Sequence, residues 1–435
     1  MLLPTPLALM LCTLWLLATA GIAIAAPGHP FWIHAGIVLA VILIADAALL
    51  FRMALPSARR EAPSALAAGR WHEVTVVLAN DLQRPLPVRI HDHHPAVFES
   101  RDLPFEVTLP ARGWARFHYG VRSTLRGAFQ FERIELRLRS PLGLFERQVR
   151  IGERQPVRVY PDFGALKGYA LLATDHRLSQ LGVLQRRRRG EGMDFHQLRE
   201  YRLGDSMRRI DWKATARMHR LISREYQDER DQAIVVLLDC GRRMATMDGE
   251  LSHFDAALNA ALLLAHVGLH HGDAVGAMTM AGDSRFIAPR KARTTVTLML
   301  NHLYDLQPTL RSPDYYTAAL ELMRRVHKRA LIVVLSNLRD EDDDTLLPAL
   351  NLMRRRHLVL FASLRERILT QTLAAKVNDL DSALTHAAAA DYLQARNAAF
   401  QRLERSGALL IDVEPQELPL ALVNRYLDIK RRGVL

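Results

Sequence analysis

Cysteine is nearly absent from this sequence, and the familiar catalytic motifs are missing. Only Cys12 and Cys240 occur in 435 residues, so no disulfide framework can be read, which fits a reducing compartment for the main body. There is no Ser/His/Asp or Cys/His set, glycine-rich phosphate loop or Cys-x-x-Cys pair. His266 and His270 have the spacing of a zinc-binding helix, but the acidic residue of that motif is missing. We therefore expect no catalytic residues, no cofactor and no enzymatic activity.

Negative charge is in deficit. The chain has 58 Lys+Arg against 46 Asp+Glu, a formal net charge of +12 at pH 7. Such an excess favours acidic partners, namely anionic lipid, nucleic acid or an acidic protein surface. The length leaves room for two or three domains with sizeable cores.

Two apolar runs within residues 1–55 predict a transmembrane helical hairpin. Residues 7–26 and 31–51 each have about the 20 residues that a membrane-spanning helix needs. Arg52, Arg59 and Arg60 follow the second run, and the connecting turn has no positive charge. By the positive-inside rule, the main body of a multi-pass protein of the bacterial inner membrane would lie in the cytoplasm.

Two features of these runs leave alternatives open. The first run could be a cleaved signal peptide, because Ala23-Ile24-Ala25 resembles a cleavage site, although no Lys or Arg precedes it. Asp46 lies near the cytoplasmic end of the second run, where we expect it to reach the interface or to pair with a basic group. The alternative for Asp46 is a buried ion-relay role.

Residues 69–160 predict a β-rich, sandwich-like domain. Short runs rich in β-branched and aromatic residues are separated by Pro, Gly and Asn-Asp turns, a pattern typical of immunoglobulin-like sandwiches. The expected strands are 74–79, 88–91, 105–109, 115–121, 134–139 and 157–160. The run from His91 to His94 suggests a metal site, but neighbouring residues on a strand point to opposite faces, so we interpret it as a polar strand end.

Residues 233–435 predict a doubly wound α/β domain, because buried strands alternate with amphipathic helices. The expected strands are 233–238, 274–281, 330–335, 358–363 and 408–413, and the expected helices are 254–269, 294–306, 315–326 and 346–356. An alanine-rich helical insertion at 374–405 is expected to pack on the surface of the same domain.

The end of the first of these strands resembles the von Willebrand factor A domain. In that family an Asp-x-Ser-x-Ser motif coordinates a divalent cation, whereas this chain has Asp239, Gly241 and Arg243. A later aspartate of the site is replaced by Asn337. Because a hard cation prefers several oxygen ligands and little positive charge nearby, we expect Asp239 and Asn337 to be vestiges of a degenerate site that binds no metal.

Residues 161–232 hold a dense cluster of charged, aromatic and glycine residues, which we interpret as an interdomain joint with a docking surface. We expect Arg187, Arg199, Tyr201 and Arg208 to be exposed and to bind a partner. Asp205, Asp211, Trp212 and Arg217 are expected to form the structural joint with the α/β domain. In that joint Trp212 would bury its ring, and Asp211 would accept hydrogen bonds from Arg217 or from backbone N–H groups.

The same cluster resembles the signature of the bacterial family called domain of unknown function 58. The resemblance rests on residues 189–195, Leu198-Arg199-Glu200-Tyr201, Gly204-Asp205 and Ile210-Asp211-Trp212-Lys213 through Arg217. Members are commonly encoded beside MoxR-type AAA+ ATPases and membrane transglutaminase-like proteins, which implies partners of these kinds and proves no reaction.

Together these features predict a non-enzymatic, membrane-anchored adaptor or scaffold that binds a MoxR-type AAA+ ATPase, in assembly or maintenance of envelope or other complexes. The alternative is a basic surface, centred on Arg186 to Arg189, that binds nucleic acid or anionic lipid head groups.

Overall fold

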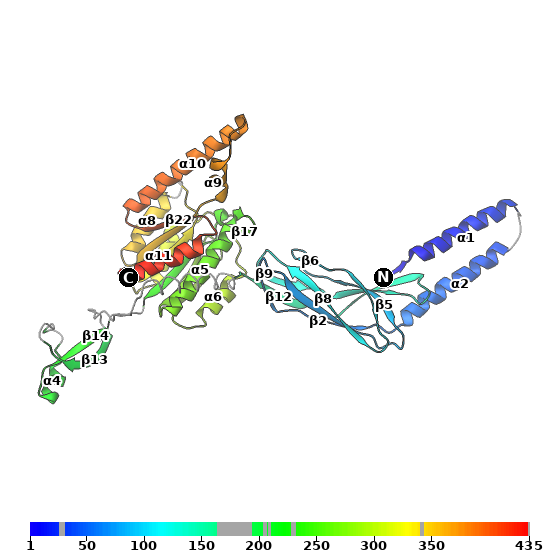
Figure 1. The fold of residues 1–435 in the computed structure, drawn as a ribbon, viewed down its shortest axis with the longest axis horizontal. Coiled ribbons are helices and arrows are strands. Elements are labelled where there is room, and N and C mark those ends of the chain that lie inside the picture. Colours follow the sequence, from blue (N-terminus) through cyan, green and yellow to red (C-terminus); the bar gives the residue numbers. More distant parts are fainter. Residues whose placement is uncertain are drawn as a thin grey trace. The chain divides into compact units, whose positions relative to one another are not determined.

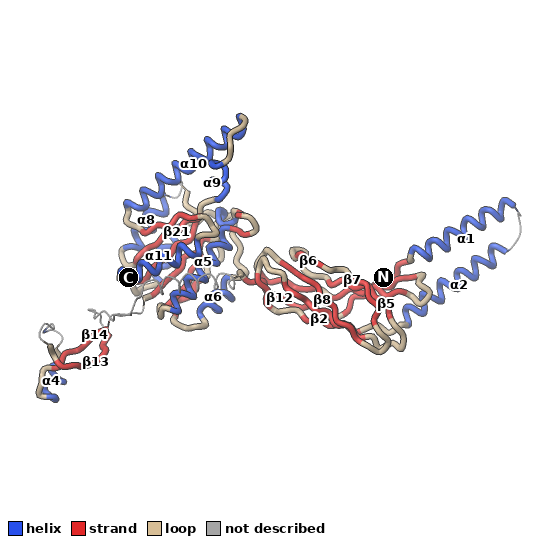
Figure 2. Tube along the Cα trace, in the orientation of Figure 1, coloured by secondary structure: helices blue, strands red, loops and turns tan. Residues whose placement is uncertain are grey.

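The computed structural model describes residues 1–25, 31–162, 194–202, 207, 210–227, 232–339 and 343–433. It divides into two compact units, Met1–Tyr160 and Pro161–Leu435. Figure 1 labels their elements along the chain, and Figure 2 shows that strands dominate the first unit beyond its helices, whereas the second unit mixes helices with a sheet.

Two apolar helices begin the first unit, α1 (Pro6–Ala25) and α2 (Phe31–Arg52). They lie side by side (Figure 1), and the Trp15 indole nitrogen is 3.4 Å from the carbonyl oxygen of Trp32. Among the described residues, Trp32–Arg52 is long and apolar enough to cross a membrane, whereas Pro6–Ile22 is a shorter apolar helix. An N-terminal helix of membrane-spanning length and composition is therefore present.

Asp46 of α2 is fully buried. Its carboxylate accepts hydrogen bonds from the backbone N–H groups of Leu142 at 2.9 Å and Leu144 at 3.3 Å. Asp46 thus accepts from backbone donors of a turn in the β-rich region, whereas we expected it to reach the interface or to pair with a basic group. Because the helix leaves this aspartate within reach of the turn, Asp46 joins α2 to the strands that follow.

The rest of the first unit is strand-rich and forms three sheets with the orders β1-β11-β10-β5-β7, β2-β4-β8-β6 and β3-β12-β9. The pairs are antiparallel except for β3 with β12. The strands are β1 (Leu2–Pro4), β2 (Ser57–Glu61), β3 (Ala65–Ala67), β4 (His72–Ala79), β5 (Leu86–Asp92), β6 (Glu99–Arg101), β7 (Phe105–Leu109), β8 (Trp114–Arg122), β9 (Gly127–Phe131), β10 (Ile134–Arg139), β11 (Phe145–Ile151) and β12 (Gln155–Tyr160).

Alternation of apolar and polar residues builds the core of this unit. In β4 the side chains of Val74, Val76 and Leu78 are buried and pack in one cluster with Ile90 and Leu136. Because successive side chains on a strand point to opposite faces, the intervening residues face outward. All six expected strands are present, but β2 and β3 precede the expected start at residue 69, and β9 and β11 were missed because their alternation is weak.

Arg60 and Asp92 form a buried ion pair inside this unit. Arg60 Nε donates to Asp92 Oδ2 at 2.8 Å, and the Tyr119 hydroxyl donates to the same oxygen at 2.6 Å. Arg60 therefore serves the core rather than the membrane surface, so the positive charge after α2 rests on Arg52 and Arg59. Burial and the charge of Asp92 raise the pKa of Tyr119 far above its ordinary value.

The second unit contains a six-stranded mixed sheet of order β19-β18-β15-β20-β21-β22. Its pairs are parallel except for β18 with β19. The strands are β15 (Ala233–Asp239), β18 (Ala274–Met280), β19 (Phe286–Arg290), β20 (Ala330–Ser336), β21 (Leu358–Leu364) and β22 (Leu409–Val413), with a small pair β16 (Met247–Asp248) and β17 (Leu251–Ser252). The helices are η2 (Arg242–Ala245), α5 (His253–His270), α6 (Thr295–Leu303), α7 (Tyr315–Arg325), α8 (Asp343–Arg354), α9 (Arg367–Ala374), α10 (Leu380–Arg405) and α11 (Leu418–Arg432).

Helices cover both faces of this sheet. Ile234, Val236 and Leu238 of β15 pack in one core with α5, α6 and α11, whereas Val235 and Leu237 pack in another with α7, α8 and α10. Both faces of β15 are therefore buried, which explains why its sequence is continuously apolar rather than alternating. The expected strands and helices of residues 233–413 are present, while β19, α9 and α11 were not expected. A separate antiparallel pair, β13 (Asp194–Glu200) and β14 (Ile222–Gln227), flanks the short helix α4 (Trp212–Met218).

Candidate functional site

The first candidate site is the signature hairpin, which we define as β13, α4 and β14. Strands β13 and β14 pair from Asp194↔Gln227 to Glu200↔Ile222, with an irregularity between Phe195 and Gln197. The backbone N–H of Tyr201 donates to Leu221 O at 2.9 Å and extends the hairpin beyond the strands. Most of the resembling residues that the structure describes thus belong to one small, locally bonded element.

Asp211 starts the helix of this hairpin. Its Oδ1 accepts hydrogen bonds from the backbone N–H groups of Lys213 and Ala214, both at 3.0 Å. These bonds satisfy donors that the first turn of a helix leaves unpaired, an effect worth about 0.5–2 kcal/mol. Of the two expected roles for Asp211, the backbone one is confirmed. The Thr215 hydroxyl accepts from Ile222 N at 3.0 Å and ties α4 to β14.

The expectation that Trp212 buries its ring is wrong for the described part of the chain. Its side chain is 67% exposed, and no residue of α4 is buried. A two-stranded hairpin and a seven-residue helix offer too few neighbours to cover an indole. Arg217, in the last turn of the same helix, is also exposed.

The residues expected to bind a partner have mixed outcomes. Arg199 is half-buried, and its Nη1 donates to Glu200 O at 3.1 Å, while Tyr201 is half-buried as well. Arg187, Asp205 and Arg208 lie outside the described residues, as does the run Arg186 to Arg189. Among the described residues of this region, the exposed large apolar side chains are Leu198, Met207, Trp212, Met218 and Leu221. They lie among exposed charged residues such as Lys213 and Arg217.

The second candidate site is the carboxyl edge of the six-stranded sheet, where β15 and β20 end beside each other. This is the point at which the strand order reverses, and ligands of open α/β sheets bind at such points. Asp239 is fully buried there. Its Oδ1 accepts from Gly241 N at 2.7 Å, and its Oδ2 accepts from the Ser336 hydroxyl at 2.6 Å. Because Ser336 donates its only proton to Asp239, the Tyr315 hydroxyl donates to Ser336 at 2.8 Å.

Gly241 closes the space next to Asp239. A Cβ atom at this position would lie 2.9 Å from Asp239 Oδ1 and 2.9 Å from Arg311 O, closer than real Cβ contacts. A serine could not stand here without a shift of the backbone. Asp239 and Asn337, which we interpreted as vestiges of a metal site, both lie at this edge of the sheet. The loop at Gly241, however, packs too closely for a serine ligand at that position.

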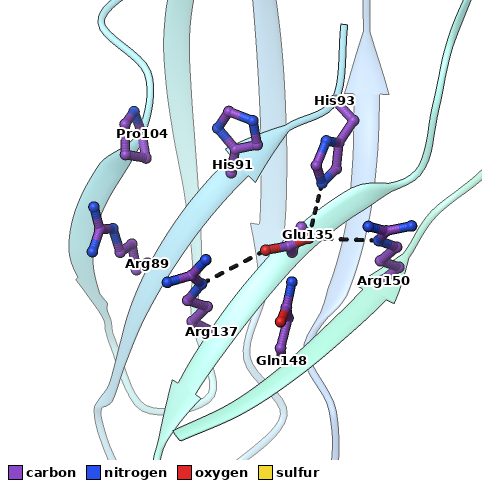
Figure 3. A pocket seen from close by; sticks show the side chains of 8 residues that line it. All are labelled: Arg89, His91, His93, Pro104, Glu135, Arg137, Gln148 and Arg150. Atoms are coloured by element: carbon purple, nitrogen blue, oxygen red, sulfur yellow. Dashed lines mark hydrogen bonds and ion pairs between the residues drawn. The ribbon is translucent and has the colours of Figure 1, made fainter. Parts of the chain in front are cut away.

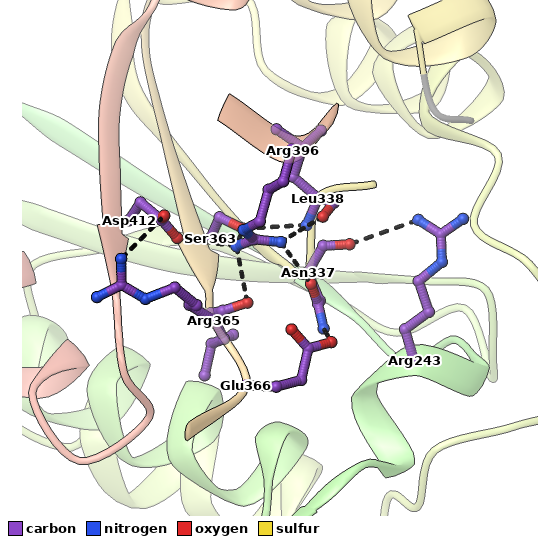
Figure 4. A network of polar contacts seen from close by, with 9 residues as sticks. Arg243, Asn337, Leu338, Ser363, Arg365, Glu366, Arg396 and Asp412 are labelled. Atoms are coloured by element: carbon purple, nitrogen blue, oxygen red, sulfur yellow. Dashed lines mark hydrogen bonds and ion pairs between the residues drawn. The ribbon is translucent and has the colours of Figure 1, made fainter. Parts of the chain in front are cut away.

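A guanidinium group from α10 fills the remaining part of this edge (Figure 4). Arg396 is 1% exposed. Its Nη1 donates to Asn337 Oδ1 at 3.0 Å and to Leu338 O. Its Nη2 donates to Ser363 Oγ at 2.7 Å, Leu364 O at 3.0 Å and Asp412 Oδ1 at 2.8 Å.

Asn337 is fixed from its other end by Glu366, whose Oε1 accepts from Asn337 Nδ2 at 2.7 Å. Arg243 Nη1 lies 3.4 Å from Asn337 O, so a second guanidinium borders the same edge. Both oxygens of Asp239 and the side-chain oxygen of Asn337 thus accept from protein donors, and two cationic side chains lie at the same edge. Such surroundings are unfavourable for a metal cation. Among the residues that the structure describes, no group of three or more His, Cys, Asp or Glu is placed to hold a metal ion.

The role of Arg396 was missed by reasoning from the sequence. Residues 374–405 were expected only to pack on the surface, yet Ala389, Arg396, Ala399 and Leu403 form the buried side of α10. The available signal was the spacing of Arg396, which shares a helix face with Ala399 and Leu403 at i+3 and i+7. A lone arginine on an otherwise apolar helix face indicates that its guanidinium meets buried hydrogen-bond acceptors.

A model of the family described as "Protein of unknown function DUF58" matches residues 197–406. No curated protein matches the sequence. Several solved structures show a weak similarity, with TM-scores too low to carry an argument about the fold. The cupredoxin domain of amoB from Nitrosocaldus yellowstonii is 13% identical over 23% of this chain and 82% of its own, with a TM-score of 0.17.

Two further structures are similar at the same level. Alpha-2-macroglobulin from Escherichia coli is 17% identical over 25% of this chain but only 17% of its own, with a TM-score of 0.21. The CARDB domain of the PF1109 protein from Pyrococcus furiosus is 12% identical over 25% of this chain and 90% of its own, with a TM-score of 0.17.

Proposed function

The chain belongs to the family of proteins of unknown function DUF58, and we propose that it is a non-enzymatic, membrane-anchored adaptor that binds a MoxR-type AAA+ ATPase. The partner class comes from the family resemblance, in which such ATPases are encoded beside family members. The proposal rests on one observation, the exposed large apolar side chains on and beside the signature hairpin.

That observation supports docking because a short helix gains its stability from what it packs against. Helix α4 spans seven residues, has no buried residue and exposes Trp212, Met218 and the nearby Leu221. Isolated helices of this length are marginal in water, and tryptophan is enriched among residues that dominate binding energies. An ATPase surface that covers the Trp212 indole would complete the packing that the hairpin lacks.

The six-stranded sheet gives a second argument for the adaptor role. Its order, with β15 in the middle and an antiparallel edge strand, is compatible with a von Willebrand A-like domain. In this chain the edge at which such a domain would hold a cation is filled by Arg396, whose Nη1 and Nη2 donate to five acceptors of the protein. We therefore propose that the domain recognises its partner without a metal ion.

Contacts at the base of the apolar helices support an anchor of two helices. The Thr5 hydroxyl, just before α1, lies within 2.7 Å of Gly143 O and 3.0 Å of Leu144 O. Asp46 of α2 accepts from the same turn, so α1 starts and α2 ends at one side of the β-rich region. This arrangement supports a membrane hairpin. We place the hairpin in the inner membrane, with the sandwich-like β region and the main body in the cytoplasm, because Arg52 and Arg59 follow α2.

The test is capture of a purified MoxR-type ATPase by the full chain in detergent, with and without ATP. Because Trp212 is exposed, Trp212→Ala should leave the melting temperature nearly unchanged, as for most surface substitutions. It should weaken capture by about tenfold or more, as loss of a central aromatic contact commonly does.

The matched control is Trp114→Ala, since Trp114 of β8 is 62% exposed in the other unit. Capture should survive that change. If the ATPase binds wild type and Trp212→Ala equally well, or does not bind the wild type under either nucleotide condition, the proposed docking surface is wrong.

A further inference from the structure

A pocket opens on the outer face of the five-stranded sheet in the first unit (Figure 3). It has a volume of about 480 Å³, and its lining includes Arg89, His91, Glu135, Arg137, Gln148 and Arg150. Pockets that hold small ligands commonly have volumes of roughly 300 to 1,000 Å³. The site lies in a different unit from the signature hairpin.

Strand register brings these side chains together. On β5 and β10, Arg89 lies opposite Arg137, and His91 lies opposite Glu135. On β10 and β11, Glu135 lies opposite Arg150. Because residues two apart on a strand share a face, three neighbouring strands present one continuous polar patch away from the core.

Positive charge exceeds negative charge in this patch. Glu135 is the one carboxylate among the lining residues, against three arginines. Its oxygens lie 3.6 Å from Arg137 Nε and 3.5 Å from Arg150 Nε, while His93 Nε2 is 2.9 Å away. Arg89 pairs outside the lining at 3.6 Å with Glu106, whose side chain is exposed, so solvent screens that pair.

Glu135 stays ionised and holds the arginines in place. Its burial by itself would raise its pKa, but hydrogen bonds from His93 and Gln148 and the charges of His93 and Arg137 lower the pKa to about 2. The pKa of His91 is lowered by burial and by His93, which favours a neutral imidazole. With three arginines against one ionised carboxylate, the lining residues have an excess of about two positive charges near neutral pH, and the Arg89 charge is paired with the exposed Glu106 outside the lining.

Arg89 and Arg137 lie directly opposite each other on β5 and β10, and their like charges disfavour folding when no ligand is bound. Like charges directly opposite each other on neighbouring strands destabilise a sheet. Both side chains face the pocket rather than the core, so packing does not require them. A bound anion between the strands would turn this repulsion into attraction.

We propose that this pocket binds a phosphate monoester group. Such a group carries a charge of about −1.5 to −2 at pH 7, which matches the excess of the lining. Its tetrahedral oxygens accept the paired N–H donors of arginine better than those of any other side chain. The volume exceeds that of phosphate, which leaves room for part of the organic group that carries it.

The first experiment titrates the full chain in uncharged detergent with inorganic phosphate at constant ionic strength, by calorimetry. The wild type should bind saturably at one site. Arg137→Gln should weaken binding at least tenfold while the melting temperature changes little, because removal of the like-charge pair with Arg89 offsets loss of the pair with Glu135. A purely structural role for Arg137 would instead lower the melting temperature.

The matched control is Arg116→Gln, since Arg116 is an exposed arginine of β8 in another sheet of the same unit. Its phosphate affinity should equal that of the wild type. Absence of saturable binding in the wild type, or an equal loss in Arg116→Gln and Arg137→Gln, would overturn the proposal.

A second experiment distinguishes a lipid source of the phosphate group from a soluble one. The phosphate titration is repeated in micelles that contain either phosphatidic acid, a phosphomonoester lipid, or phosphatidylglycerol, a phosphodiester. A tenfold lower apparent affinity with phosphatidic acid alone identifies a lipid head group, and unchanged affinities in both identify a soluble phosphomonoester. Equal competition by both lipids would contradict selectivity for a monoester.

Discussion

Two of the places where arginines meet acidic or polar groups differ in how many acceptors each guanidinium has. At the carboxyl edge of the six-stranded sheet, Arg396 is buried and donates to five acceptors. In the pocket of the β-rich unit, Arg137 and Arg150 share the single carboxylate of Glu135 at 3.6 and 3.5 Å. A buried cation whose two terminal nitrogens donate to five acceptors stabilises the fold, whereas surface cations that share one carboxylate keep donors for a ligand.

The largest loss of stability should come from removing the Arg396 guanidinium at the carboxyl edge of the six-stranded sheet. Arg396→Met removes a buried guanidinium and leaves Asp412, Asn337 and Ser363 without their shared partner. Loss of one member of a buried charged set commonly costs about 3–5 kcal/mol. We expect urea unfolding of the full chain in detergent to show a loss of that size.

Arg405→Met provides the control for this measurement, since Arg405 is exposed on the last turn of the same helix. Its free energy of unfolding should stay within about 0.5 kcal/mol of the wild type. Equal stability of the two variants would show that the Arg396 network contributes nothing.

The pocket should respond to pH through Glu135. Its folded-state pKa of about 2 lies below its ordinary value of 4.5. A depressed pKa contributes stability that is complete above about pH 4.5 and is lost as the pH falls towards 2. At about 1.4 kcal/mol per pKa unit, the contribution is at most about 3.5 kcal/mol.

Unfolding free energies of wild type and Glu135→Gln at several pH values test this. The difference should be largest near neutral pH and should shrink below pH 4.5, the ordinary pKa of the carboxyl. A difference that does not change with pH would mean that Glu135 acts only by packing.

The smallest effect should be that of a divalent cation on the melting temperature, through the carboxyl edge of the six-stranded sheet at Asp239. Both Asp239 oxygens accept protein hydrogen bonds, and Arg243 and Arg396 border the same space. Magnesium at about 10 mM should therefore shift the melting temperature by no more than about 1 °C, because a ligand stabilises only in proportion to its binding. A sub-micromolar dissociation constant that disappears in Asp239→Ala would contradict this expectation.

Elements with a strong local pattern could be predicted from the sequence. The continuously apolar run of β15 and the alternating run of β10 were placed within a residue or two, because burial on two faces or one face leaves its period in the sequence. The signature residues were also enough to identify the family, and Asp211 was recognised as an acceptor for backbone donors. In each case the information lies within a few neighbouring residues.

Contacts between distant segments were decided by the tertiary structure. Arg396 meets Asn337 across 59 positions, and Asp46 meets Leu142 across 96, so no local pattern could pair them. The exposure of Trp212 depends on how much surface lies around α4, and the pocket depends on the register of three strands. The sequence by itself determined which side chains are apolar, charged or able to cap a helix. Their partners were set only when the chain folded, because burial and charge pairing depend on distances between segments far apart along it.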